Sequence, residues 1–90
     1  MTLTIEKYAE DQTTVFRLSG RMRVDGLLEL KRRLGGLRGT PVLDLKEVTH
    51  VDLDVVHFLG SCVQQGIALR NCASYIREWI RREQGRQTDG

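Results

Sequence analysis

The sequence predicts a small α/β domain, in which a mixed β-sheet of about four strands is covered by about three helices in the order β-β-α-β-α-β-α. Three observations lead to this prediction. Four short runs have the apolar alternation or continuity of strands, and three longer segments repeat apolar residues every three to four positions, as amphipathic helices do. After the second strand, helices and strands alternate. Strand–helix–strand units of this length indicate parallel strands joined by right-handed crossovers, with the helices covering the sheet.

The first two strands are predicted to form an antiparallel hairpin. Residues Thr2 to Tyr8 alternate between apolar and polar positions, and Thr14 to Leu18 provide a second apolar run. The polar residues Glu10 to Gln12 supply the turn between the two strands, and Ser19-Gly20 ends the hairpin.

A first helix is predicted from Val24 onward, because leucines recur there at helical spacing. Gly35 and Gly36 are predicted to end it, since glycine is the usual residue where a helix closes in a left-handed turn. The apolar stripe of this helix consists of Leu27, Leu28, Leu30, Leu34 and Leu37.

The centre of the chain predicts a buried strand followed by a capped helix. Pro41 precedes Val42 to Leu45, a run with the apolar content of a strand buried on both faces. Asp52 is placed to cap the next helix, because its carboxylate can accept hydrogen bonds from the free amides of the first turn. Gly66 closes this helix, and Ile67 to Leu69 form a last short strand. The apolar stripe of the helix consists of Val55, Val56, Leu59, Cys62 and Val63.

A third amphipathic helix is marked by Tyr75, Ile76, Trp79 and Ile80 and fades at Gln84-Gly85. We therefore assign residues 1–84 to a single domain and residues 85–90 to a disordered polar tail. Five arginines crowd this end of the chain, and we interpret them as the solvated face of the helix. They are Arg70, Arg77, Arg81, Arg82 and Arg86.

Composition excludes several classes of function. A net charge of +2 is too small to indicate a nucleic-acid partner. The chain has neither the roughly 20 consecutive apolar residues of a membrane span nor a signal-peptide pattern, so we expect a cytoplasmic protein without a membrane partner. Its two cysteines, Cys62 and Cys72, lack CxxC spacing and are interpreted as reduced thiols.

The segment from Pro41 to Leu59 resembles the signature segment of the STAS domain family, which includes the anti-sigma-factor antagonists. In that family an Asp-Ser-Ser-Gly or Asp-Ser-Thr-Gly turn stands here, and its first hydroxyl residue is phosphorylated by a partner kinase. The resemblance covers nearly the whole chain. It is carried by Leu18-Ser19-Gly20-Arg21-Met22, Val42-Leu43-Asp44-Leu45, Val48-Thr49, Asp52, Leu69-Arg70-Asn71-Cys72 and Tyr75-Ile76-Arg77.

Three departures from the family pattern change what the resemblance implies. The turn reads Asp52-Leu53-Asp54-Val55, so Leu53 replaces the phosphorylated hydroxyl residue. Arg23 stands where the family often has an aspartate, which reverses the charge and suggests a changed partner. The chain also stops after the third helix, where relatives usually add a strand or helix. This is expected to leave a sheet edge or an apolar helix face for a second subunit.

The residues themselves offer two weaker chemical alternatives. His50, Asp52, Asp54 and His57 are a concentrated set of potential metal ligands, although a zinc site needs three or four ligands that converge. The set is also explained without a metal. Asp52 can cap the helix, Asp54 can place a favourable charge near its start, and the two histidines can be surface residues. The potential nucleophiles are Ser61, with His57 four residues earlier as a base, and Cys62. The sequence shows no oxyanion-hole loop that would support either. We therefore predict no catalytic residue, no metal and no cofactor.

The sequence leads to one main hypothesis and two alternatives. The main hypothesis is a non-catalytic interaction module that resembles an anti-sigma-factor antagonist and binds an anti-sigma or switch-kinase partner without serine phosphorylation. The first alternative is a structural or homo-oligomerising subunit with a second interface at Tyr75 and Trp79. The second is a metal-dependent small-ligand enzyme. The partner-binding residues predicted by the main hypothesis are Arg23, Thr49, His50, Asp52, Leu53, Asp54 and Val55.

Overall fold

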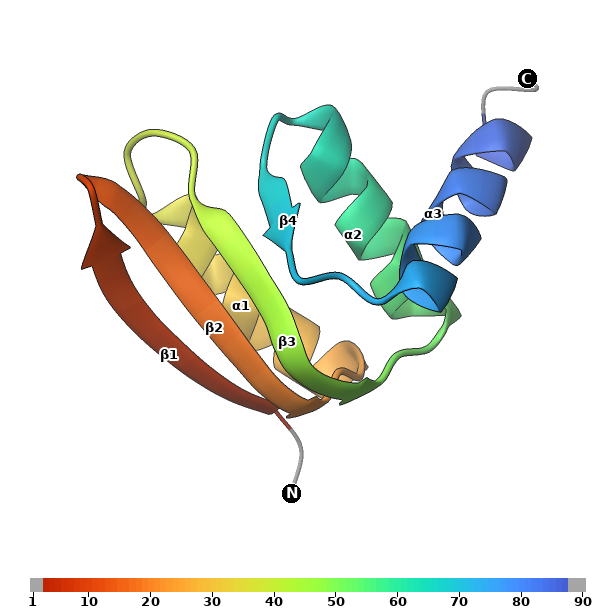
Figure 1. Cartoon of the computed structure of the whole chain (residues 1–90), viewed down its shortest axis with the longest axis horizontal. Helices are drawn as coiled ribbons and strands as arrows, with labels where there is room; N and C mark the ends of the chain where they lie inside the picture. The colour runs from red at the N-terminus through yellow and green to blue at the C-terminus, as the bar shows by residue number, and fades with distance from the viewer. Residues whose placement is uncertain (1–2, 88–90) are drawn as a thin grey trace.

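The computed structural model describes residues 3–87 and confirms the predicted α/β fold and order of elements. One four-stranded sheet has the strand order β1-β2-β3-β4, and three helices accompany it (Figure 1). The elements are β1 (Leu3–Glu10), β2 (Thr13–Arg21), α1 (Val24–Gly35), β3 (Val42–His50), α2 (Leu53–Gln64), β4 (Ala68–Arg70) and α3 (Ser74–Gln87).

Strands β1 and β2 form the predicted antiparallel hairpin. Their register pairs Leu3 with Gly20 at one end and Glu10 with Thr13 at the other. The connecting residues Asp11 and Gln12 have φ values of 51° and 69°. Two successive residues of positive φ suit a two-residue hairpin loop, because such a loop follows the natural twist of the strands.

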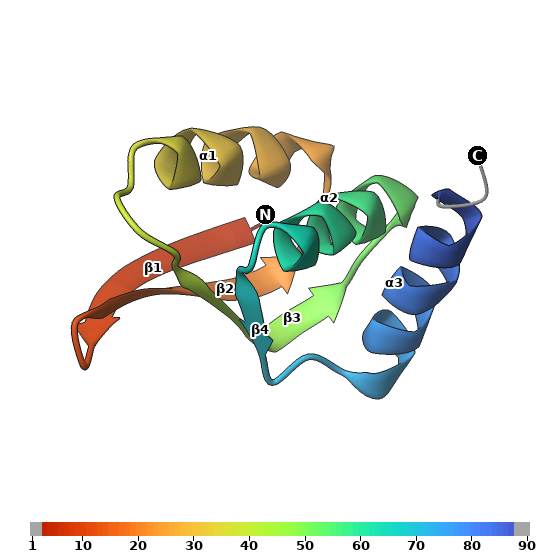
Figure 2. The ribbon, with the colours of Figure 1, turned by 90° about the horizontal axis from the view of Figure 1, so that it is seen from above.

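The other two strand pairs are parallel, as the alternation of helices and strands predicts. Helix α1 connects β2 to β3, and α2 connects β3 to β4. Figure 2 shows α1 and α2 lying over the same face of the sheet, whereas α3 stands beside α2. Helix α3 thus packs on α2, where Ile76 and Ile80 are buried and Gln84 Nε2 donates to the Gly60 carbonyl at 3.2 Å.

The core lies between the sheet and the two helices above it. Central strand β3 is buried on both faces as predicted, because Leu43 and Leu45 are buried together with the intervening Asp44. Two residues of the predicted helical stripes are exposed instead: Leu28 is 65% exposed and Val63 is 43% exposed. Each sits at the margin of its stripe, where a small rotation of the helix decides whether the side chain faces the core.

The two long crossover helices end differently. Helix α2 closes at Gly66 as predicted: φ is 90°, the Gly66 amide donates to the Val63 carbonyl at 3.0 Å, and the Ile67 amide donates to the Cys62 carbonyl at 2.9 Å. These two bonds define a Schellman motif. Helix α1 ends at Gly35 with Gly36 as its C-cap, as predicted, but the predicted left-handed turn is wrong, because Gly36 has a φ of −92°.

Helix α3 runs to Gln87, so residues 85–87 continue a helix that was predicted to fade at Gly85. The rest of the predicted tail, residues 88–90, lies outside the described residues, as does Thr2 of the first predicted strand. Arg77, Arg81 and Arg82 are exposed, and the side chain of Arg86 lies outside the described ones.

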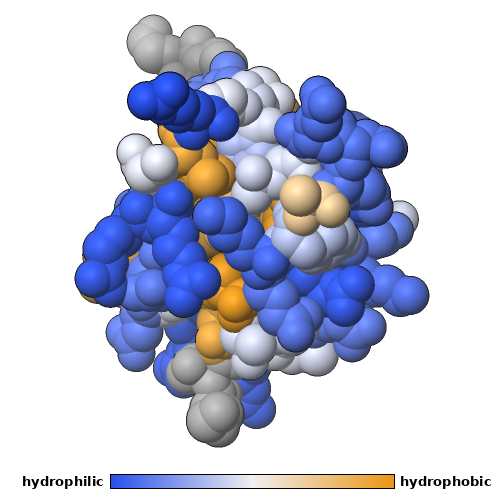
Figure 3. All heavy atoms as spheres, turned by 90° about the vertical axis from the view of Figure 1, so that its left-hand side faces the viewer, coloured by the Kyte–Doolittle hydropathy of each residue, from blue (hydrophilic) through white to orange (hydrophobic). Residues whose placement is uncertain are grey.

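The surface beside β1 is mostly polar but is crossed by an apolar strip (Figure 3). On β1, Leu3 and Ile5 are half-buried and contact the core. No helix within residues 3–87 combines the length and the apolar character that a membrane crossing requires.

Candidate functional site

The turn between β3 and α2 holds the start of α2 in a fixed position. Strand β3 continues to His50, so only Val51 and Asp52 separate it from the helix. Val51 is buried. The Asp52 carboxylate accepts a hydrogen bond from the Val55 amide at 3.0 Å, which confirms the predicted helix cap. Such a cap contributes about 1 kcal/mol.

Leu53 is the first residue of α2, and its side chain is 46% exposed. Asp54, also exposed, follows it in the first turn, where a negative charge interacts favourably with the helix dipole. The turn therefore presents one apolar and one acidic side chain in successive positions at the capped start of α2. Val55 differs from the other predicted contact residues because its side chain is fully buried. It belongs to the core and is not available to a partner.

A polar hollow lies on one side of this turn, at the carboxyl ends of β2 and β3. A hydrogen bond of 2.9 Å from the Met22 amide to the His50 carbonyl holds these two strand ends together. Arg23 is the N-cap residue of α1, but its side chain forms no capping hydrogen bond. The hollow is lined by Arg21, Arg23, Thr49, His50 and Asp52, which include four of the predicted partner-binding residues.

An amphipathic groove lies on the other side of the turn, between α1 and α2. Four of its lining side chains are apolar, and Asp54 joins them from the first turn of α2. Lys31 spans part of the groove, with its Nζ atom 5.7 Å from the centre of the Phe58 ring, a cation–π distance. The lining residues are Val24, Leu27, Leu28, Lys31, Asp54, His57, Phe58 and Ser61.

Sequence reasoning missed the α1 side of this groove. Val24 and Leu28 are exposed there although both are apolar, and helical periodicity alone assigned Leu28 to the core. The available signal was the width of the apolar stripe: Leu27 and Leu28 point about 100° apart around the helix, so one of the two lies at the edge of the stripe, where packing decides its exposure.

The set of potential metal ligands is divided by the fold. His50 and Asp52 line the polar hollow, whereas Asp54 and His57 line the groove between α1 and α2. His57 Nε2 lies 2.9 Å from Glu83 Oε1 on α3. Among the described residues, no three histidine, cysteine or acidic side chains are grouped so that they could hold a metal ion.

The potential nucleophiles are also separated by the fold. Ser61 is exposed in the groove, while Cys62 faces the core. Burial raises the pKa of the Cys62 thiol to about 11. A thiol with such a pKa remains protonated near neutral pH and reacts slowly. Burial likewise raises the pKa of the Cys72 thiol. Both cysteines are free, as predicted.

Asp44 is the one buried charged residue among those described, and it fastens the β4–α3 loop to the central strand. Burial by itself would raise the pKa of this carboxyl group. Hydrogen bonds from the Lys46 amide at 3.0 Å and from Asn71 Nδ2 at 3.1 Å outweigh burial and hold the pKa below its usual value. Asp44 therefore stays ionised and acts as a structural residue.

The predicted second interface lies on α3. Tyr75 is 56% exposed, and Trp79 is half-buried against the core. Together with Glu78 and Arg82 they line a shallow hollow. This surface is separate from the turn between β3 and α2.

Comparison with models of protein families and with curated proteins found no match for the chain. The resemblance to STAS domains stays a prediction from sequence motifs.

Proposed function

We propose that the protein is a non-catalytic interaction module of the anti-sigma-factor antagonist type. It binds an anti-sigma or switch-kinase partner through the start of α2, the polar hollow and the groove between α1 and α2. The resemblance of the Pro41 to Leu59 segment to the STAS signature supports the class of partner, and the geometry of the turn supports the contact surface.

The exposure of Leu53 at the start of α2, directly before a residue of the groove that other exposed apolar side chains line, carries this proposal. Within the described chain five large apolar side chains are exposed: Val24, Leu28, Leu53, Val63 and Tyr75. Val24 and Leu28 line the groove, and Leu53 directly precedes Asp54, which lines it too. Gathered apolar surface with a polar rim is typical of a protein-binding site.

The rim charges would select the partner. Lys31 and Asp54 line the groove together with its apolar residues, and Arg21, Arg23 and Asp52 line the polar hollow. Such charges set the association rate and the choice of partner more than the affinity. Because Leu53 has no hydroxyl group, binding is constitutive at this position and follows the abundance of the partner.

The test uses two double variants with identical changes in charge. Leu53→Arg with Asp54→Arg alters the proposed site, and Tyr75→Arg with Glu78→Arg makes the same change at exposed positions of α3. Each protein is used to capture partners from lysate of the source cells, which are identified by mass spectrometry. We expect the wild type and the α3 variant to capture the same kinase-like protein and the Leu53/Asp54 variant to lose it. Equal capture by all three proteins would contradict the proposal.

A second candidate function is homo-oligomerisation through α3, which the exposed Tyr75 beside Trp79 favours. Tyrosine, tryptophan and arginine are the residues that most often dominate binding energy at interfaces. In this case light scattering should show a dimer for the wild type and a monomer for the Tyr75/Glu78 variant. A wild-type monomer at high protein concentration would exclude this candidate.

A further inference from the structure

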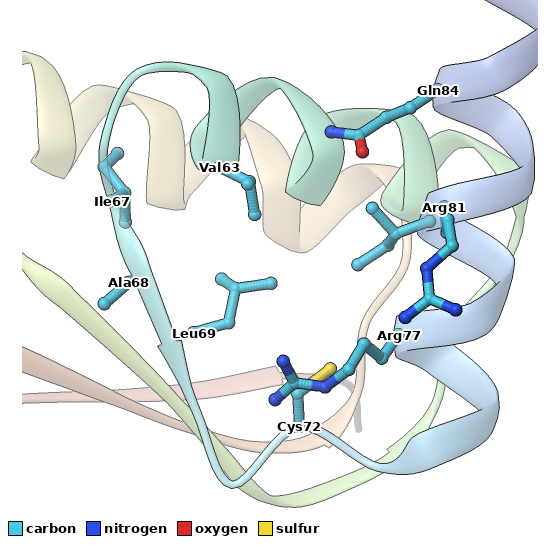
Figure 4. Close-up of a pocket in the computed structure, with 9 residues that line it drawn as sticks. Val63, Ile67, Ala68, Leu69, Cys72, Arg77, Arg81 and Gln84 are labelled. Atoms are coloured by element: carbon cyan, nitrogen blue, oxygen red, sulfur yellow. The ribbon is translucent and has the colours of Figure 1, made fainter.

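An apolar groove beside β4 is separate from the proposed partner site. It has a volume of about 290 Å³ and lies between β4 and α3, with the C-terminal end of α2 behind it (Figure 4). Its apolar lining consists of Val63, Ile67, Ala68, Leu69, Cys72 and Ile80. The α1–α2 groove uses Asp54, His57, Phe58 and Ser61 of α2 instead, so the two surfaces share no lining residue.

Strand β4 offers an open edge at this groove. Ala68–Arg70 pairs with β3 and is the last strand of the described sheet. Its outer edge therefore carries backbone donors and acceptors that have no strand partner among the described elements. An extended peptide can bind to such an edge, since main-chain hydrogen bonds supply affinity and pockets for alternate side chains supply specificity.

Charge indicates which peptide fits. The charged residues of the described chain that line the groove are Arg77 and Arg81, both on α3. Figure 4 shows the Arg77 side chain extending from α3 to Cys72, whereas the guanidinium group of Arg81 stays beside α3. Arg81 Nη1 lies 3.0 Å from Glu78 Oε1, whereas Arg77 forms no ion pair among the described residues. Arg77 also counteracts the effect of burial on the pKa of Cys72, so its positive charge acts inside the groove.

A second copy of the chain is a poorer occupant than an acidic peptide. A symmetric dimer joined edge to edge at β4 would place the same surface of both copies together. Each copy would bring Arg77 and Arg81 to this shared surface, and like charges brought together destabilise the pairing.

We propose that this groove is a second binding surface for an extended acidic peptide of a partner protein. The peptide adds as a strand along β4. Its apolar side chains on one face enter the groove near Val63 and Leu69, and its carboxylates reach Arg77 and Arg81.

Peptide binding measured by fluorescence anisotropy tests the proposal. The probes are four labelled hexapeptides that alternate glutamate with valine, leucine, isoleucine or phenylalanine, together with versions that carry lysine in place of glutamate. At least one glutamate peptide should bind saturably with a Kd below about 1 mM, and its lysine version should bind more weakly. A version of the bound peptide with N-methylated backbone amides should lose binding, because it cannot pair with a strand edge.

Two charge reversals on the same helix locate the binding site. Arg77→Glu should weaken binding of the glutamate peptide by roughly tenfold, since it turns a rim attraction into a repulsion. Arg82→Glu makes the same change at an exposed position that lines the Tyr75 hollow instead, and it should leave the affinity unchanged. The Leu53/Asp54 double variant should bind the peptide like the wild type. Peptide binding at β4 is therefore tested independently of partner binding at the start of α2.

Several outcomes would overturn the proposal. If none of the four glutamate peptides binds, or if Arg82→Glu weakens binding as much as Arg77→Glu, the groove does not select an acidic strand. Undiminished binding of the N-methylated peptide would show that the occupant is not a strand. A dimer in light scattering whose β4 amides are protected from hydrogen exchange would show that a second copy covers the groove.

Discussion

Replacing Gly66 by alanine should destabilise the protein through its backbone alone. The φ of Gly66 is 90°, and a Cβ atom at this position would meet no heavy atom within 4 Å. A clash therefore contributes nothing. A left-handed backbone costs a residue with a side chain roughly 1–2 kcal/mol, and the smaller entropy of the unfolded alanine chain returns about 0.5 kcal/mol. The free energy of unfolding should fall by about 1 kcal/mol, which lowers Tm by about 4–8 °C for a domain of this size.

Gly35→Ala is the matched control with the opposite sign. A methyl group at Gly35 would also meet no heavy atom within 4 Å, but this residue lies at the end of α1 without a positive φ. Alanine should therefore raise the free energy of unfolding by about 0.5–1 kcal/mol, because it is the better helix former. Urea denaturation followed by circular dichroism measures both variants, provided that the m-value stays constant.

The stability changes of Gly66→Ala and Gly35→Ala together test whether α2 needs a left-handed glycine at its end. Equal effects of the two alanines, or a neutral Gly66→Ala, would refute the conclusion that a left-handed glycine is required to close α2. A Gly66→Asn variant provides a further check, because asparagine tolerates this conformation better than alanine does. It should lose less stability than Gly66→Ala.

Three further predictions follow from the site and the core. Asp52→Ala should lower the free energy of unfolding by about 1 kcal/mol in urea denaturation. Asp52→Asn should lower it by clearly less, because asparagine also caps helices. Equal losses would refute the role of the hydrogen bond from the Val55 amide. The pKa of Asp44 is lowered in the folded state, so its ionised form contributes stability above about pH 3.9, and this contribution is lost as pH falls through the folded-state pKa. Unfolding measured between pH 7 and pH 2 should therefore show a weaker acid dependence for Asp44→Asn than for the wild type, and identical slopes would contradict the assignment. In a Cys72→Ser background, Cys62 should react with a thiol reagent at pH 8 at least about 100-fold more slowly in the folded than in the urea-unfolded protein, because a pKa of about 11 leaves little thiolate; comparable rates would show that Cys62 is accessible and ionised.

The fold was predictable because local patterns agreed with one another along the chain. The hairpin followed from apolar alternation around Glu10 to Gln12, and the parallel strands followed from the alternation of helices and strands after it. The cap at Asp52 and the closure at Gly66 were also predictable, since each depends on a chemical property of one residue type at a helix end.

Errors arose where the outcome depended on how elements pack against one another. Leu28 and Val63 have the spacing of core residues but lie at the edges of their stripes, and only the position of each helix over the sheet decides their exposure. Gly36 illustrates a related point, because glycine permits a left-handed helix end but does not require one.

The candidate site was predictable in part. Thr49, His50, Asp52, Leu53 and Asp54 lie around one turn because neighbouring positions in sequence remain neighbours at a strand end and a helix start. Arg23 joins them only through the tertiary structure, because the parallel strands β2 and β3 end side by side. Val55 was misplaced because a four-residue motif read as a linear string ignores that successive helical residues point in different directions.

The sequence by itself determined the elements, their order, the caps that start and close α2, and the absence of a hydroxyl group at Leu53. These are local properties, set by side-chain chemistry and by the periodicity of a few neighbouring residues. Only the tertiary structure decided which apolar side chains remain exposed, how α1 joins α2 to form one groove, and that Arg77 of α3 lines a groove together with residues of β4. These features depend on the placement of segments distant in sequence, which is fixed by the packing of the whole core.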